Sequence, residues 1–443
     1  MTIQFLYPEI CLFVFALVLL LGGVVSSIKK FLGLFAILGV VGAFILLPAA
    51  AASPTTAFFN LIHGDGISLF FRALILMSTG FIIFLSMGDN QIQEEDKAEY
   101  YFFILSLAIS MMLAVSTKNL LMIYIALEAV SIISYILVGY FKNNIFSSEA
   151  GLKYFLFGAL STGIMLYGIS LIYGLFGTLD LSSMTTLLQE GHGYKAAFLL
   201  SMVFILVGLS FKCSLAPFHM AAPDAYQGAP TAVTAFLSIG PKAMGFALLL
   251  RVFIGSHVSV IMPWSQLAQI LAILTMTIGN IIALKQTNVK RMLAYSSIAH
   301  AGFMLMALAV VNTVGIKALL IYLFMYVFMN VGAFGCVILT GRDQIEQYAG
   351  LSRQYPLAAL VMAASLLSLA GLPPLAGFMA KFVVIASVIQ AKYYTLAIVA
   401  VLNSVVALFY YLRIIKLMYL SKYNFFEPLK SSSALFIVLA ITL

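Results

Sequence analysis

The chain has 443 residues, of which 63% are hydrophobic and only 9% are charged, and its mean hydropathy is +1.11. This composition excludes a soluble globular protein and indicates a helical protein that crosses a membrane many times, because apolar runs of about 20 residues recur along the whole length. The net charge of +8 is spread over short loops without a basic helix or patch, which excludes a nucleic-acid-binding surface.

The apolar runs predict about fourteen transmembrane spans. The first run, from Tyr7 to about Val25, has no basic segment before it, so we interpret it as a span rather than a cleaved signal peptide. The last run stops at Leu443 after about eleven residues, so we expect an incomplete final helix. The predicted spans lie near 7–27, 31–50, 67–88, 100–117, 119–141, 153–176, 195–216, 231–254, 264–284, 291–311, 317–339, 356–390, 393–420 and from 433 onward.

Basic residues in alternating loops predict the orientation of the chain. Fourteen of them fall on one side of the predicted spans and six on the other. Because cytoplasmic loops carry the excess of Lys and Arg, we expect the first side in the cytoplasm and the N-terminus outside. The acidic run EEDKAE at 94–99 has little weight in this rule.

Two apolar regions do not fit straight helices. The run 356–390 has 35 residues, which as one helix is about 52 Å long against an apolar bilayer core of about 30 Å. It contains GLPPLAG at 371–377, whose prolines remove two backbone donors, so we predict a broken helix. The region 211–233 is interrupted by Pro217, Pro223 and Pro230, which predicts a second break.

Helix breaks in corresponding places are typical of inverted-repeat transporters with a site at mid-membrane depth. We therefore predict an all-α fold with two inverted five-helix repeats and flanking helices. The predicted parts are N-terminal flanking helices, a first repeat, a second repeat and the start of an incomplete C-terminal helix, at 1–99, 100–254, 264–420 and 421–443.

Four charged residues lie deep inside the apolar segments: Glu128, Lys212, Lys242 and Lys381. The other 20 basic residues fall in or beside predicted loops. A charge near the centre of a bilayer costs roughly 2.5–3.5 kcal/mol, and such residues usually line an ion or proton path. These four residues are therefore the main indication of function.

The first two of these charges each have a structural and a functional interpretation. Glu128 either fixes helix packing as the partner of one lysine, or its field sets the proton affinity of that lysine. Lys212 either snorkels toward the end of its span or carries protons, because buried lysines lose their charge readily and a nearby carboxylate favours the charged form. Tyr124, Ser131 and Tyr135 can share the helix face of Glu128, and we assign them no role.

Similar alternatives hold in the second half of the chain. Lys242 follows Pro241 inside a span and is either a counter-ion or part of the path. Lys381 closes the second broken helix and is the best candidate for a terminal proton donor to one side. His300 either packs as a hydrogen-bonding residue or relays protons between Lys242 and Lys381. We interpret His219 as structural.

The remaining motifs argue against a redox or metal centre in this chain. Cys11, Cys213 and Cys336 stand alone, without a CxxC pair or metal-ligand spacing, and no GxGxxG or phosphate loop follows a predicted strand. We expect no flavin, iron–sulfur cluster, nucleotide or metal here, so any redox chemistry takes place elsewhere.

Four segments resemble the antiporter-like membrane subunits of respiratory complex I. These segments are FKCSLAPFHMAAPDAYQGAPTAVTAF, GNIIALKQTNVKRMLAYSSIAHAGF, SLAGLPPLAGFMAKF and FYYLRIIKLMYL. The string PDAYQGAP and the lysine in GFMAKF are similar to the subunit N branch of that family. The resemblance covers essentially the whole chain, and the ending inside the fourteenth span is its one departure.

The resemblance implies a proton path and partners. The family's path residues map onto Glu128, Lys212, Lys242, His300 and Lys381. The implied partners are the other antiporter-like and small membrane subunits in a bacterial inner membrane, with NADH, FMN, iron–sulfur clusters and quinone in partner subunits. The alternatives are a subunit of a stand-alone Mrp-type cation/proton antiporter and a substrate-binding carrier, and PDAYQGAP argues against both.

Overall fold

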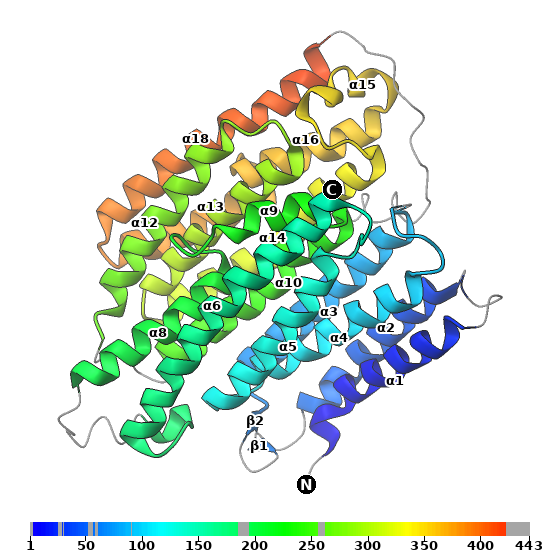
Figure 1. The fold of residues 1–443 in the computed structure, drawn as a ribbon. Helices are drawn as coiled ribbons and strands as arrows, with labels where there is room; N and C mark the ends of the chain where they lie inside the picture. The colour runs from blue at the N-terminus through cyan, green and yellow to red at the C-terminus, as the bar shows by residue number, and fades with distance from the viewer. Residues whose placement is uncertain are drawn as a thin grey trace. The chain divides into compact units, whose positions relative to one another are not determined.

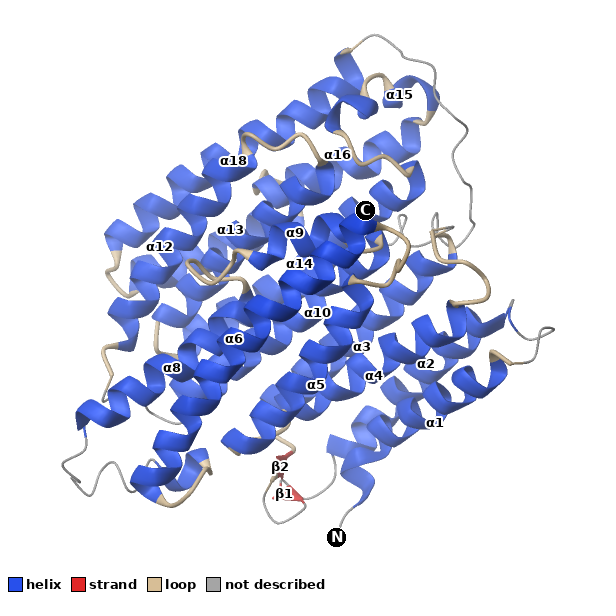
Figure 2. Ribbon diagram, viewed as in Figure 1, coloured by secondary structure: helices blue, strands red, loops and turns tan. Residues whose placement is uncertain are grey.

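The structure is a computed structural model, and it describes residues 3–24, 29, 31–51, 56–57, 61–89, 91–184, 195–255 and 262–421. Almost all of this part of the chain is helical (Figure 2). Two short strands, β1 (Thr56–Ala57) and β2 (Ile62–His63), pair antiparallel. The predicted all-α fold is confirmed.

Twelve helices in the described residues are long and apolar enough to cross a membrane. They coincide with predicted spans, while the predicted run from 433 lies outside the described residues. The helices are η1 (Ile3–Leu6), α1 (Tyr7–Gly22), α2 (Leu32–Ala51), α3 (Gly66–Met87), α4 (Lys97–Val115), α5 (Leu120–Val138), α6 (Ile145–Phe176), α8 (Lys195–Cys213), α9 (Ala221–Gly228), α10 (Thr231–Leu249), η3 (Leu250–Gly255), α12 (Trp264–Ala283), α13 (Val289–Ala309), α14 (Thr313–Thr340), η4 (Ile345–Tyr348), α15 (Leu351–Gln354), α16 (Pro356–Ala370), α17 (Ala376–Gln390) and α18 (Tyr394–Leu420).

The chain folds into two compact units. Within the first, α1 packs on α2 and α4, α4 on α5, and α6 on both α5 and α8 (Figure 1). Within the second, α14 packs on α13, α16 and α17, and α18 packs on α16 and α17. The division into inverted five-helix repeats stays a prediction. The described residues of the first unit belong to Met1–Ile83, Gln91–Cys213 and Gly240–Trp264, and those of the second to Phe84–Asn90, Ser214–Ile239 and Ser265–Leu443.

Local sequence signals explain where several spans begin and end. The Asn119 side chain accepts hydrogen bonds from the first turn of α5, and Asn288 and Asn312 do the same for α13 and α14. These bonds satisfy backbone donors that a helix start otherwise leaves unpaired. Gly177 and Gly341 end α6 and α14 in the left-handed conformation, which glycine adopts without a steric penalty.

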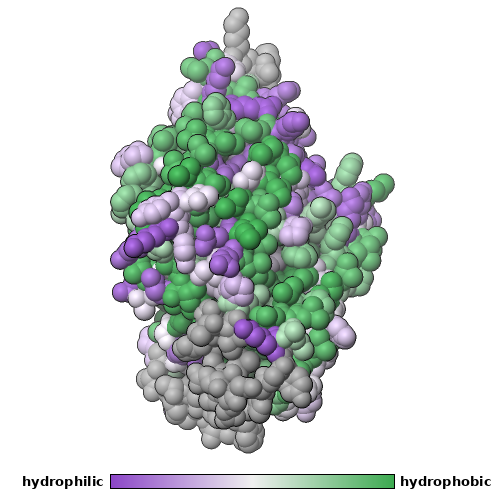
Figure 3. All heavy atoms as spheres, turned by 90° about the vertical axis from the view of Figure 1, so that its left-hand side faces the viewer, coloured by the Kyte–Doolittle hydropathy of each residue, from purple (hydrophilic) through white to green (hydrophobic). Residues whose placement is uncertain are grey.

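The outer surfaces of the helices are apolar. Large hydrophobic side chains such as Ile45, Leu160 and Phe409 are more than 60% exposed. Figure 3 shows apolar side chains gathered over much of one face, with polar side chains between them. Apolar side chains exposed on this scale are typical of helices that face lipid or other membrane subunits.

Candidate functional site

Glu128 lies in the middle of α5, about three turns from its capped start at Asn119. One of its carboxylate oxygens, Oε1, is buried and has no hydrogen-bond partner in the described part of the chain. A buried carboxylate oxygen without a partner is costly. Glu128 Oε1 can therefore still accept a hydrogen bond from a donor group.

Lys212 lies in the last turn of α8 and is buried. Its Nζ donates a hydrogen bond to Ser131 Oγ at 3.2 Å, and Ser131 Oγ donates in turn to the Leu127 carbonyl at 2.8 Å. Ser131 follows Glu128 by three residues, so both face the same side of α5. Among the described ion pairs there is none between Lys212 and Glu128, although the two charges interact electrostatically at longer range.

Lys242 lies inside α10, directly after Pro241, and is 1% exposed. The packing of α10 on the end of α8 depends on Gly245, because a Cβ at this position would lie 2.6 Å from Cys213 Sγ and 3.7 Å from the carbonyl carbon of Lys212. Lys242 also interacts electrostatically with Cys213. The first unit therefore brings Glu128, Lys212 and Lys242 into one region.

Lys381 lies in α17, beyond the break that was predicted at GLPPLAG. The break is confirmed, because α16 ends at Ala370, Gly371 follows it as the cap with φ +88°, and α17 begins at Ala376. Lys381 Nζ donates to the Ala370 carbonyl at 2.9 Å, and a Cβ on Gly371 would lie 2.8 Å from Lys381 Cδ. Glycine is thus required both for the left-handed turn and for the space that the lysine occupies.

His300 lies in α13 and is held by two tyrosines of the second unit. Its Nδ1 shares a hydrogen bond of 2.6 Å with Tyr322 OH, and its Nε2 lies 3.5 Å from Tyr411 OH. Phe303 lies near both His300 and Lys381: its ring centre is 6.3 Å from that of His300 and 4.8 Å from Lys381 Nζ. The second unit therefore brings His300 and Lys381 to the same aromatic side chain.

The polar residues after the first break anchor α9. Asp224 and Gln227 both accept hydrogen bonds from Arg291 Nη1 at the start of α13. The first break is confirmed, since α8 ends at Cys213 and α9 begins at Ala221. The anchored α9 thus packs on the helix that carries His300.

Two arginines that were counted among the basic residues in or beside loops are buried. Arg72 lies in the second turn of α3, where its Nη2 lies 2.6 Å from Glu9 Oε2 and donates to the Phe5 carbonyl at 3.0 Å. Arg251 is also buried, and forms two hydrogen bonds with the Asp65 carboxylate at 2.7 and 2.9 Å. Each guanidinium tolerates burial because a carboxylate from a distant part of the chain pairs with it.

Sequence reasoning missed the groups that hold the ionisable side chains. It assigned no role to Ser131 and did not identify Tyr322, Tyr411, Phe303 or the Ala370 carbonyl. The spacing of Ser131 from Glu128 was the only usable signal. The chain contains 22 tyrosines and 36 phenylalanines, so no single aromatic residue is distinctive.

Comparisons with known proteins identify the family. The transmembrane family described as NADH:quinone oxidoreductase/Mrp antiporter matches residues 116–407, a range that contains all five predicted path residues. The curated protein NADH-quinone oxidoreductase subunit N of Trichlorobacter lovleyi is 42% identical over 426 residues, which are 94% of this chain and 88% of that protein. The chain belongs to the NADH-quinone oxidoreductase subunit N family.

Solved structures agree with membership in the subunit N family. A chain of respiratory complex I from Thermus thermophilus is 34% identical, with a TM-score of 0.82 over 98% of this chain and 96% of that one. A chain of the Mrp complex from Dietzia sp. DQ12-45-1b has a TM-score of 0.79 over 96% of this chain and 82% of that one, but only 22% identity. The second likeness shows a shared fold alone, and the resemblance predicted from the motifs is confirmed.

Proposed function

We propose that this chain is a proton-translocating membrane subunit of a multisubunit NADH:quinone oxidoreductase, with Glu128, Lys212, Lys242, His300 and Lys381 as its proton path. The observation that carries the proposal is the burial of Lys212, Lys242, His300 and Lys381 inside membrane helices, with Lys212 and Lys381 each next to a helix break. Ionisable residues at this depth are costly and are usually part of ion or proton paths. The assignment of NADH as the electron donor and quinone as the electron acceptor rests on the names of the relatives.

In the first unit, the proposed step is a change of acceptor for Lys212. Its ammonium bonds to the neutral hydroxyl of Ser131, one helical turn from the Glu128 carboxylate. Beside the carboxylate the charged form of the lysine is favoured, whereas beside a hydroxyl in a buried site the proton is released more easily. Movement of Nζ between the two acceptors thus loads and releases a proton, and Lys242 is the next group along the path.

In the second unit, His300 receives the proton and passes it toward Lys381. Hydrogen bonds with Tyr322 and Tyr411 engage both nitrogens of the imidazole, so the ring can accept a proton at one nitrogen and give one up at the other. Phe303 lies beside both the imidazole and Lys381, and its apolar ring cannot relay a proton, so the proposed transfer to the lysine passes through water next to it.

The proposal also covers partners and location. NADH, FMN, iron–sulfur clusters and quinone belong to partner subunits, and this chain contributes no redox centre. Its neighbours are other antiporter-like and small membrane subunits in a bacterial plasma membrane, with the N-terminus outside. The four parts predicted from the sequence, two repeats with flanking helices, belong to the same proposal.

Relatives at about 42% identity favour the oxidoreductase over the Mrp-type antiporter, whose solved structure is only 22% identical.

Removal of the first-unit charges tests the proposed path. Lys212→Ala and Glu128→Ala should each strongly reduce proton pumping coupled to quinone reduction in membrane vesicles. Lys317→Ala, which removes an exposed lysine from α14, is the matched control and should pump normally. The amount of assembled protein in the membrane is measured in parallel. Wild-type pumping by both path variants would overturn the proposal.

A further inference from the structure

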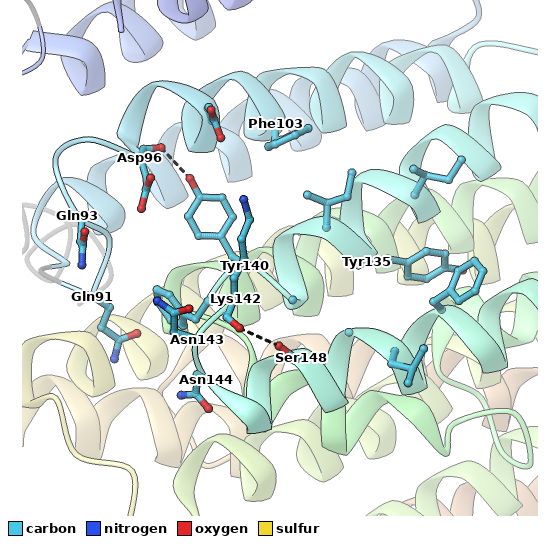
Figure 4. A pocket seen from close by; sticks show the side chains of 18 residues that line it. Gln91, Gln93, Asp96, Phe103, Tyr135, Tyr140, Lys142, Asn143, Asn144 and Ser148 are labelled. Atoms are coloured by element: carbon cyan, nitrogen blue, oxygen red, sulfur yellow. Dashed lines mark hydrogen bonds between the residues drawn. The ribbon is translucent and has the colours of Figure 1, made fainter. Parts of the chain in front are cut away.

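A cavity of about 1030 Å³ lies in the first unit. Its walls are the segment that precedes α4, the outer faces of α4, α5 and α6, and the loop that joins α5 to α6 (Figure 4). A cavity of this size holds a ligand as large as a cofactor or part of a lipid. No group of the proposed proton path lines it.

One end of the cavity is polar and charged. Asp96, Glu99 and Lys142 line this end and are exposed, and Figure 4 shows Asp96 and Lys142 gathered there with asparagine and glutamine side chains. Asp96 stands at the start of α4, but its carboxylate makes no capping hydrogen bond. The Tyr140 hydroxyl donates to the Asp96 carbonyl at 2.7 Å and so ties the two loops together. The hydrogen bond to its backbone thus fixes Asp96 at the edge of the cavity, while its carboxylate does not cap α4.

The other end of the cavity is apolar. Ile132 and Ile136 of α5 and Leu152 and Phe155 of α6 line it, and each is between 43% and 58% exposed. On α5 the exposed apolar row continues to Leu121, which is about 22 Å from Ile136 along the helix at 1.5 Å per residue. That length is comparable to an extended acyl chain, and the row runs away from the charged end.

The order of these surfaces matches a phospholipid whose headgroup lies at the loops and whose chain follows the helices. The charged groups of the lining are two carboxylates and one ammonium, so a headgroup with a net negative charge is repelled. A headgroup that carries an amine beside a phosphate is favoured, because the amine can pair with the carboxylates and the phosphate with the ammonium. A primary ammonium donates hydrogen bonds to carboxylates, which a quaternary ammonium cannot do.

We propose that this cavity binds one phospholipid of the phosphatidylethanolamine type. Its ammonium bonds to Asp96 and Glu99, its phosphate lies against Lys142, and one acyl chain covers Ile132 and Ile136. The proposal needs only the membrane-spanning fold of the family and is independent of the proton path.

Photo-crosslinking tests this proposal. The full-length chain, with the subunits that co-purify with it, is reconstituted in vesicles of phosphatidylethanolamine and phosphatidylglycerol. The vesicles contain a trace of either lipid with a diazirine in its acyl chain. Labelled peptides are then mapped by mass spectrometry. We expect the ethanolamine probe, and not the glycerol probe, to label α5 and α6 near Ile132 and Leu152.

Variants separate headgroup recognition from general lipid contact. The double variant Asp96→Asn, Glu99→Gln should lower labelling about fivefold, the change expected for loss of exposed ion pairs. The matched control is Glu94→Gln, Glu95→Gln, which removes two exposed carboxylates that precede α4 but do not line the cavity. If the first variant fails to assemble, Ile136→Trp, which fills the apolar end, should lower labelling instead.

Equal labelling by the two probes, or equal labelling in the lining and control variants, would overturn the proposal. Absence of label from α5 and α6 in the wild-type protein would overturn it as well, and would point to a protein partner on this face.

Discussion

The hydrogen bond from Lys212 to Ser131 allows the sharpest perturbation of the proposed path. Ser131→Ala removes the hydroxyl that accepts from Nζ at 3.2 Å and leaves the Glu128 carboxylate one turn away. A hydrogen bond to a charged group contributes about 1.5–3 kcal/mol. Its loss shifts Lys212 toward the carboxylate by about tenfold to 150-fold, at 1.36 kcal/mol for each factor of ten. If the proton is released beside Ser131, that step slows by the same factor.

We expect Ser131→Ala to slow both proton pumping and quinone reduction by about tenfold or more, because the two processes are coupled. The assay follows acidification of inverted vesicles with a pH-sensitive dye, together with NADH oxidation. Ser131→Thr keeps the hydroxyl and should retain most activity. Ser134→Ala is the matched control, since Ser134 is buried in the same helix and, among the described residues, its hydroxyl bonds to the Val130 carbonyl and not to a group of the proposed path. Normal pumping by Ser131→Ala would refute the two-acceptor mechanism.

Three further predictions follow from the same structure. Glu9→Ala leaves a buried arginine unpaired and should destabilise the protein by about 3–5 kcal/mol, seen as a lower midpoint of thermal unfolding. Gly371→Ala should impair pumping more than Gly341→Ala, because both glycines have positive φ but only the first contacts Lys381; equal loss contradicts this account. Burial alone raises the pKa of Asp65, but the hydrogen bonds and charge of its arginine partner hold that pKa below its ordinary value. Its stabilising contribution is therefore complete above the unfolded pKa of about 3.9 and is lost as the pH falls below it, so Asp65→Asn should flatten the acid limb of a plot of unfolding midpoint against pH.

The sequence predicted the spans well because membrane helices carry a strong local signal. A bilayer requires about 20 apolar residues for each span, whatever the helix packs against. The two breaks were equally predictable, since Pro217 and the prolines of GLPPLAG prevent a continuous helix. The buried lysines could be identified from the sequence, because a charged residue inside an apolar run is costly and is usually functional.

What the sequence did not predict are relations between distant segments. Arg72 appeared to belong near a loop, because nothing local indicates that Glu9 lies against it. The contact of Lys212 with Ser131 joins residues 81 positions apart, and the bond of His300 to Tyr411 joins residues 111 apart. Such pairs depend on which helices pack together, and apolar runs of similar composition do not encode that choice.

The break before Lys381 has a further electrostatic consequence. The carbonyl that accepts from Nζ is the last one of α16, at the end of a helix where the aligned peptide dipoles carry about half a negative charge. Among the described residues, no carboxylate lies within ion-pair distance of this lysine. When it gives up its proton, it leaves behind a neutral amine and a partial charge that the backbone always carries. Lys212 differs, because a carboxyl group, that of Glu128, interacts with it electrostatically. The hydrogen-bond acceptor beside Lys381 is therefore a part of the backbone, whose partial charge does not change when the lysine loses its proton.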